Sequence, residues 1–257
     1  MSAQNVAVLR ATPLPSPDDI AALESHLLDN PEDLEAQGKI LRIYAETASW
    51  RYDPGRESVR LQHILYLVQR HPEAAVSASR AAYIHRAGRP DANAADHDAV
   101  RQAWLDAVQS HPKDTPVTLN AVRFLAVEDA DDAERVLDRA IDAQPDNRAL
   151  AAHLGFIYAM ELLGLPSLDR EAKPVVRGSE HADRAKQELE QTSNAVVLAA
   201  AGTALANLAK AFSVDATNQT MFDFADQLTT RARQLAPDDR DIQGPMPLIQ
   251  YFVAAQR

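Results

Sequence analysis

Apolar residues recur at helical spacing along most of this chain, in segments separated by short polar turns. Around the first turn, Leu23 and Leu27 precede Pro31, and Ile40 and Leu41 follow it. Apolar side chains three or four residues apart lie on one face of an α-helix, so the pattern predicts amphipathic helices joined by turns. Twelve helices are expected, at residues 17–30, 32–47, 57–70, 73–86, 95–110, 115–127, 130–143, 146–163, 179–191, 193–211, 220–235 and 239–255.

The same kind of turn occurs six times. The turns read LDNPED, QRHPEA, QSHPKD, AQPDN, EQTSN and LAPDD, with anchors at Pro31, Pro72, Pro112, Pro145, Thr192 and Pro237 that lie 41, 40, 33, 47 and 45 residues apart. Proline stops one helix and fits the first turn of the next, so each anchor is expected at a helix boundary. The acidic residue after it, such as Glu32, Glu73 or Asp146, is expected at the positive end of the new helix. The recurrence predicts a two-helix structural repeat.

The segment from 132 to 158 resembles the junction between two tetratricopeptide repeats, in which small and large apolar residues stand at fixed offsets from a proline. Counted from Pro145, the matching residues are Ala133, Leu137, Ala140, Leu154, Gly155 and Tyr158. The other copies match more loosely, and the resemblance covers about residues 17–243. It implies an all-α fold, a right-handed superhelical α-solenoid of about six antiparallel helix pairs. The insertions and the GPMP sequence at 244–247, which breaks the final helix, depart from the family pattern.

Gly155 stands inside an expected helix, where glycine costs about 1 kcal/mol relative to alanine. In the repeat scheme it lies where the first helix of a pair presses against the second, and a missing Cβ lets the two backbones approach. The same interpretation applies to Gly202. Both are therefore predicted to be packing glycines and not parts of a ligand loop.

The domain organisation follows from the repeats. Residues 1–16 are expected to be a flexible N-terminal segment, and 17–257 a single repeat domain with insertions near 49–58, 86–98, 163–181 and 212–220. All four insertions fall between the first and second helix of a pair, so they emerge along one edge of the array. Such an edge is a candidate contact surface, or simply tolerated loop growth. In the first insertion Trp50, Arg51 and Tyr52 could anchor a partner or fold over the helix ends.

Composition narrows the class of function. The formal charge is −11 and the pI is near 5.1, which argues against a nucleic-acid or anionic-membrane partner. Cysteine is absent, so there is no disulfide and no thiolate metal site. No apolar run reaches the roughly 20 residues of a membrane helix, and no signal peptide is visible, so a cytoplasmic protein is expected.

Catalytic and metal-binding patterns are missing from the sequence. Neither a phosphate-binding glycine motif nor GxSxG nor HExxH occurs. His71 and His111 each precede an anchor proline, a position at which a histidine can contact the last carbonyls of a helix. No catalytic residue, metal ligand or cofactor is therefore assigned, and an enzyme is the least favoured class.

Tetratricopeptide arrays bind partners on a concave surface lined by the first helix of each pair. The resemblance implies that this groove includes Arg42, Tyr83, Arg86, Arg123 and Phe156. Arginine offers a planar fork for carboxylates and an aromatic ring offers rigid apolar area. The alternative is that the aromatic residues are core and the arginines are solvated or paired with nearby acidic residues.

The function expected from these observations is a non-catalytic scaffold or adaptor that binds a protein or peptide with acidic and apolar groups. A second hypothesis is an assembly or regulatory subunit contacted through the insertion edge. In that case self-association through the C-terminal stretch PLIQYFV is possible, although this stretch is favoured instead as a cap on the last helix pair.

Overall fold

The computed structural model describes residues 16–48, 54–87, 92–164, 179–212 and 218–244. Within these ranges the chain is helical and contains no strand, which confirms the all-α class. The elements are α2 (Pro17–Asp29), α3 (Leu34–Ala48), α4 (Pro54–Arg70), the 3₁₀ turns η1 (Ala75–Ala78) and η2 (Arg80–Ala82), α5 (Ala94–Ser110), α6 (Thr115–Glu128), α7 (Ala130–Ala143), α8 (Arg148–Leu162), α9 (Ser179–Gln191), α10 (Ala195–Phe212), α11 (Asn218–Leu235) and α12 (Arg240–Gln243).

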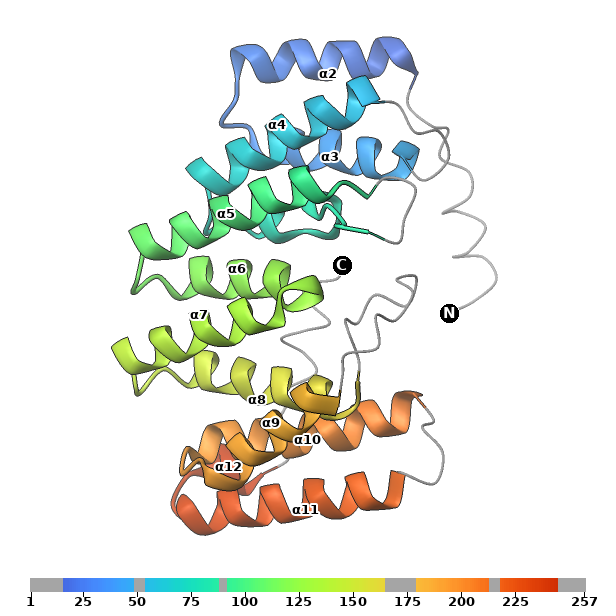
Figure 1. Cartoon of the computed structure of the whole chain (residues 1–257). Helices are drawn as coiled ribbons and strands as arrows, with labels where there is room; N and C mark the ends of the chain where they lie inside the picture. Colours follow the sequence, from blue (N-terminus) through green and yellow to red (C-terminus); the bar gives the residue numbers. More distant parts are fainter. Residues whose placement is uncertain (1–15, 49–53, 88–91, 165–178, 213–217, 245–257) are drawn as a thin grey trace, which may run out of the picture.

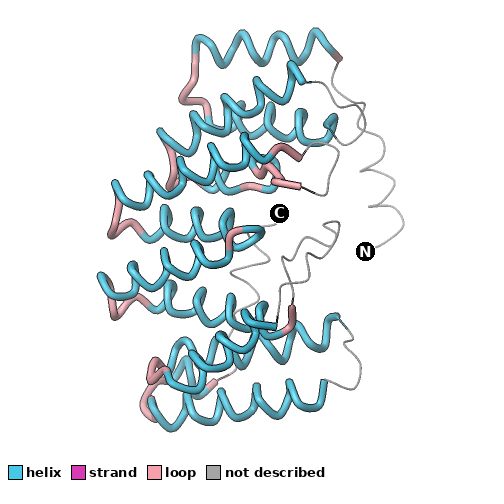
Figure 2. The backbone as a smooth tube through the Cα atoms, viewed as in Figure 1, coloured by secondary structure: helices cyan, strands magenta, loops and turns pink. Residues whose placement is uncertain are grey.

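The helices stack from α2 at one end to α11 at the other, and successive helices turn back on one another (Figures 1 and 2). Each helix from α2 to α8 contacts the next helix, and this includes α4 and α5. The turns η1 and η2, which lie between α4 and α5 in the sequence, contact α3. In addition α6 contacts α8, and α8 packs along α10, so these three helices form a row. One large core runs through the stack from Leu41 of α3 to Ile242 of α12.

Five helices, α3, α6, α8, α10 and α12, begin directly after an Asp or Asn that stands two residues beyond an anchor. Asp114 accepts a hydrogen bond from Val117 N at 3.1 Å, and Asn147 accepts from Ala149 N at 3.2 Å. Asp33, Asn194 and Asp239 accept equivalent bonds from backbone amides at the starts of α3, α10 and α12. Such a side chain satisfies an amide that the first helical turn leaves without a partner. The anchor residue itself therefore lies in the turn, before the helix, and not in its first turn as the sequence pattern predicted.

The one anchor without such a cap is Pro72, and the helix predicted at 73–86 is wrong. Ala74 occupies the cap position and its side chain makes no capping bond; only η1 and η2 form. The carbonyls of this stretch instead bind side chains from neighbouring helices: Arg60 of α4 donates to the carbonyls of Ala81 and Tyr83, and Asn120 of α6 donates to those of Pro72 and Ala74. Tertiary hydrogen bonds thus replace the helical ones.

The other helix predictions hold: ten of the twelve expected helices correspond to α2 to α11. The last, predicted at 239–255, begins as α12 and ends at Gln243, where the GPMP sequence follows. The rest of that prediction, including PLIQYFV, lies outside the described residues, as do residues 1–15 and a part of each of the four insertions.

Gly155 and Gly202 are packing glycines, as predicted. A Cβ on Gly155 would lie 2.3 Å from the carbonyl oxygen of Val197, and one on Gly202 would lie 2.7 Å from that of Ala225. Gly202 faces α11, the second helix of its own pair. The neighbour of Gly155 is different from the one predicted, because it faces α10, the first helix of the next pair, and not α9.

Gly155→Ala is expected to destabilise the fold by about 3 kcal/mol or more, because its methyl group would overlap backbone that must then move. Gly38→Ala in α3 is the matched control: its Cβ would lie 3.1 Å from the side chain of Val76, which can shift, and the gain in helix propensity of about 1 kcal/mol offsets that contact. Urea unfolding followed by circular dichroism measures both variants. Equal stability of the two variants would contradict a backbone contact at Gly155.

Candidate interaction surface

Arg123 lies on α6 and is half-buried. Its Nη1 donates to Asn120 Oδ1 at 3.3 Å, and no carboxylate of the described residues lies within ion-pair distance of it. Burial lowers the pKa of its guanidinium, because a low-dielectric environment disfavours the charge. A charged group in this position retains hydrogen-bonding capacity that the described part of the protein does not use.

The side chain of Asn120, which accepts the hydrogen bond from Arg123, is held in one orientation by two further hydrogen bonds. It is buried, and its Nδ2 donates to Pro72 O at 2.9 Å and to Ala74 O at 3.1 Å. With both amide hydrogens engaged, its oxygen faces the guanidinium. The non-helical stretch after Pro72 and the arginine of α6 are therefore linked through one amide side chain, a role that the sequence analysis did not assign to Asn120.

The two aromatic residues predicted for the groove are packed against other side chains. Phe156 of α8 is buried in a small core cluster with Met160 and Leu205. Tyr83 is partly buried, and its ring centroid lies 4.9 Å from that of Phe124. Neither residue presents an open ring face of the kind that an anchor site needs, so their part in partner binding stays a prediction.

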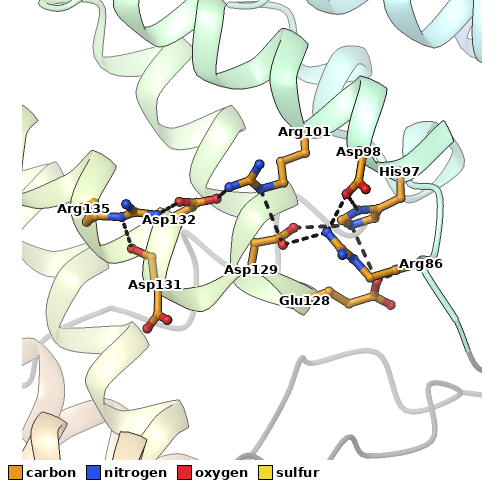
Figure 3. Close-up of polar contacts among 9 residues, drawn as sticks. All are labelled: Arg86, His97, Asp98, Arg101, Glu128, Asp129, Asp131, Asp132 and Arg135. Atoms are coloured by element: carbon orange, nitrogen blue, oxygen red, sulfur yellow. Dashed lines mark hydrogen bonds and ion pairs between the residues drawn. The ribbon is translucent and has the colours of Figure 1, made fainter. Parts of the chain in front are cut away.

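Arg42 and Arg86, the other two predicted groove residues, are both exposed. Arg86 lies in the turn between η2 and α5 and takes part in a polar cluster (Figure 3): its Nη2 lies 2.5 Å from Asp98 Oδ1 and 3.5 Å from Asp129 Oδ1. Its backbone N–H donates to Glu128 Oε2 at 2.8 Å. Arg86 thus joins the start of α5 to the turn between α6 and α7.

His97 lies at the centre of this cluster and is fully buried. Its Nε2 is 3.4 Å from Asp129 Oδ2 and 3.5 Å from Glu128 Oε2, and its ring stacks on Phe124 with centroids 5.2 Å apart. Farther along the cluster Arg101 contacts Asp132, which also contacts Arg135 (Figure 3). The cluster therefore holds α5 against the turn between α6 and α7 by several charged contacts.

Two adjacent carboxylates in the cluster have opposite pKa shifts. Burial raises the pKa of Asp129, and the nearby His97 and two arginines offset this only in part. Burial also acts to raise the pKa of Glu128, but hydrogen bonds from His85 and from the Arg86 backbone, together with His97, bring it below its usual value. Hydrogen bonds to the charged form explain the difference between the two groups.

A second polar cluster joins α7, α8 and α9. Arg184 of α9 lies 2.8 Å from Asp131 and 3.1 Å from Glu134, both on α7. One turn beyond Glu134, burial and the negative charges of Glu134, Glu188 and Asp142 raise the pKa of Asp138 to about 6. Carboxylates of α7 and Glu188 of α9 therefore lie close together around Asp138.

A third polar cluster connects the first three helices. His63 of α4 contacts Gln37 through Nδ1 at 2.8 Å and Glu24 through Nε2 at 3.2 Å, and Tyr44 donates to the same glutamate. Each of these groups has at least one partner on a different helix, so the cluster links α2, α3 and α4. It belongs to the stacking of the array.

Within the described ranges no group of three or more His, Cys, Asp or Glu side chains is arranged to hold a metal ion. The helices described there also include none with the length and apolar character of a membrane span. Trp50, Arg51 and Tyr52, predicted for the insertion edge, lie outside the described residues. Comparison of the chain with family models and with curated proteins gives no match.

Asp138→Asn is expected to stabilise the protein at neutral pH and to have no effect near pH 4. The pKa of Asp138 is about 6 in the folded protein and near 3.8 in the unfolded chain, so the folded state retains a proton that the unfolded state releases. Stability therefore falls as pH rises from about 4 to 6, and removing the charge restores it. Surrounding side chains desolvate the carboxyl of Asp138 in part, but the residue is still exposed by its accessible surface, and solvent screens its charge. The gain at pH 7.5 is therefore less than about 1 kcal/mol, or about 2 °C in Tm.

Thermal unfolding of Asp138→Asn and wild type at pH 4 and pH 7.5 measures this difference. Asp226→Asn, an exposed aspartate within α11, is the charge-matched control and should change Tm equally little at both values. A difference between Asp138→Asn and wild type that is the same at both pH values would exclude the raised pKa.

Proposed function

We propose that this chain is a non-catalytic interaction protein of the tetratricopeptide-like kind, which holds a segment of a protein or peptide on its first-helix layer. That layer consists of α3, the stretch with η1 and η2, and the row of α6, α8 and α10. Stacked helix pairs give a long regular surface in which side chains of successive helices lie side by side, as such arrays use for binding.

The observation that carries the proposal is Arg123. A half-buried guanidinium held by one amide oxygen, with no acidic partner in the described part of the chain, has free donors for a carboxylate. The contrast with Arg86 and Arg184, each of which contacts two or more carboxylates, supports it. A partner with an acidic group flanked by apolar residues would match Arg123 and the largely apolar helices beside it.

Reversing the charge at Arg42 and Arg123 together is expected to reduce partner affinity by about tenfold or more, because an interfacial charge pair that loses one member costs 2–5 kcal/mol. Partners recovered from a native lysate with wild type are identified by mass spectrometry. Their affinities for wild type and variants are then measured by titration calorimetry at low and moderate salt.

The control for charge is the pair Arg70→Glu and Arg139→Glu, two exposed arginines on α4 and α7 of the second-helix layer. Arg123→Lys keeps the positive charge, so it shows whether the charge at this position is enough for binding. Circular dichroism checks that each variant is folded. Unchanged affinity in the folded Arg42 and Arg123 double variant would refute the proposed surface.

A further inference from the structure

A small cavity lies at the C-terminal end of the row of first helices, between α10, α11 and α12. Its volume is about 190 Å³, and its walls include Ala199 and Thr203 of α10, Thr229 of α11, Ile242 of α12, and Gly244. An apolar cavity of about 150 Å³ is enough for a benzene molecule. The volume therefore fits a single large side chain and is below the usual range for a small-molecule site.

The lining is partly apolar and partly polar, and its apolar part can receive an apolar side chain. Ala199 and Ile242 are buried and carry no side-chain polar atom. The hydroxyl of Thr229 donates within α11, to the carbonyl of Ala225 at 3.1 Å, so it already has a hydrogen-bond acceptor. The polar members Asn207 and Arg233 complete the lining.

The end of the described chain forms part of the wall of this cavity. Gly244 is both a wall residue and the last described residue before position 245. Its backbone is extended, with φ −88° and ψ 176°, so α12 ends there. Pro245 and Pro247 follow, and a residue before proline disfavours the helical conformation.

The sequence that follows supplies large apolar side chains for the apolar part of the lining. Residues 245–257 read PMPLIQYFVAAQR, which includes Met246, Leu248, Ile249, Tyr251 and Phe252 and no acidic residue. Leu248 is only four residues beyond Gly244, a reach of at most about 14 Å. A tether this short gives an effective concentration in the millimolar range, which favours the chain's own segment over a second copy or another protein.

We propose that residues 246–252 dock on this end of the array and insert one large apolar side chain into the cavity between α10, α11 and α12. The docked segment covers the cavity at the C-terminal end of the row of α6, α8 and α10. This contact is intramolecular, and it stands independently of the peptide-binding function proposed above.

Because the chain has no cysteine, disulfide trapping tests the contact without background. Thr203→Cys is combined in turn with Met246→Cys, Leu248→Cys, Ile249→Cys, Tyr251→Cys or Phe252→Cys in the full chain. A disulfide needs Cα atoms within about 7 Å, so only docked positions react efficiently. At least one pair is expected to form an intramolecular disulfide about tenfold or more faster than the same tail cysteine paired with Ser25→Cys.

Ser25 is an exposed position on α2, at the end of the array opposite α11 (Figure 1), and so reports random encounters of the tail. Circular dichroism and Tm of Thr203→Cys alone show that the cavity variant is folded. Adding Leu248→Asp to the fastest of the other pairs should slow its reaction to the control rate. Reaction of every pair at the Ser25 rate, or disulfides that form only between two molecules, would overturn the proposal.

Discussion

The close approach of α8 and α10 is the constraint on which the described array depends. It exists because Gly155 has no side chain where the carbonyl of Val197 and the backbone of Ala201 come near. Gly202 then permits the same approach between α10 and α11. Helices that touch through backbone and alanine leave little room for repacking, so these contacts set the spacing of the three helices for the rest of the stack.

The half of the array before α8 is held together in a different way. There the stretch after Pro72 forms no α-helix, and side chains of neighbouring helices bind the carbonyls that a helix would have used. The polar cluster around His97 fixes α5 to the turn between α6 and α7, close to this irregular unit. Hydrogen bonds and charge contacts thus add to the packing of buried alanines in this half of the stack. One of these hydrogen bonds joins Asn120 to Arg123.

The sequence predicts most helices because their start and end signals are local. An anchor followed two residues later by Asp or Asn supplies a turn and a cap, and the apolar spacing supplies the buried face. Ala74 in that cap position is a signal in the sequence that residues 73–86 do not start an α-helix as the other copies do. The cap residue carries this signal, and the proline does not. Gly155 was recognisable as a packing residue, but its neighbour on α10 depends on how two units stack.

The sequence could not predict the polar clusters in this way. Nor could it predict whether each groove arginine is buried or paired with a carboxylate. Arg86 meets Asp129 across 43 residues of sequence and Arg184 meets Asp131 across 53, and such pairs follow only from tertiary packing. Arg42, Arg86 and Arg123 were all predicted for the groove, but among the described residues only Arg86 has carboxylates within ion-pair distance. Burial and hydrogen bonding, and not residue type, distinguish Arg123 from the others.

Native-state hydrogen exchange tests the central claim most directly, because it reports the free energy at which each backbone amide opens. If the contact at Gly155 organises the array, amides of α8 and α10 between Leu154 and Leu205 exchange together at the highest free energy in the chain. Amides near η1 and η2 then open at lower free energy. Exchange of α10 at a free energy well below that of α8 would contradict the account.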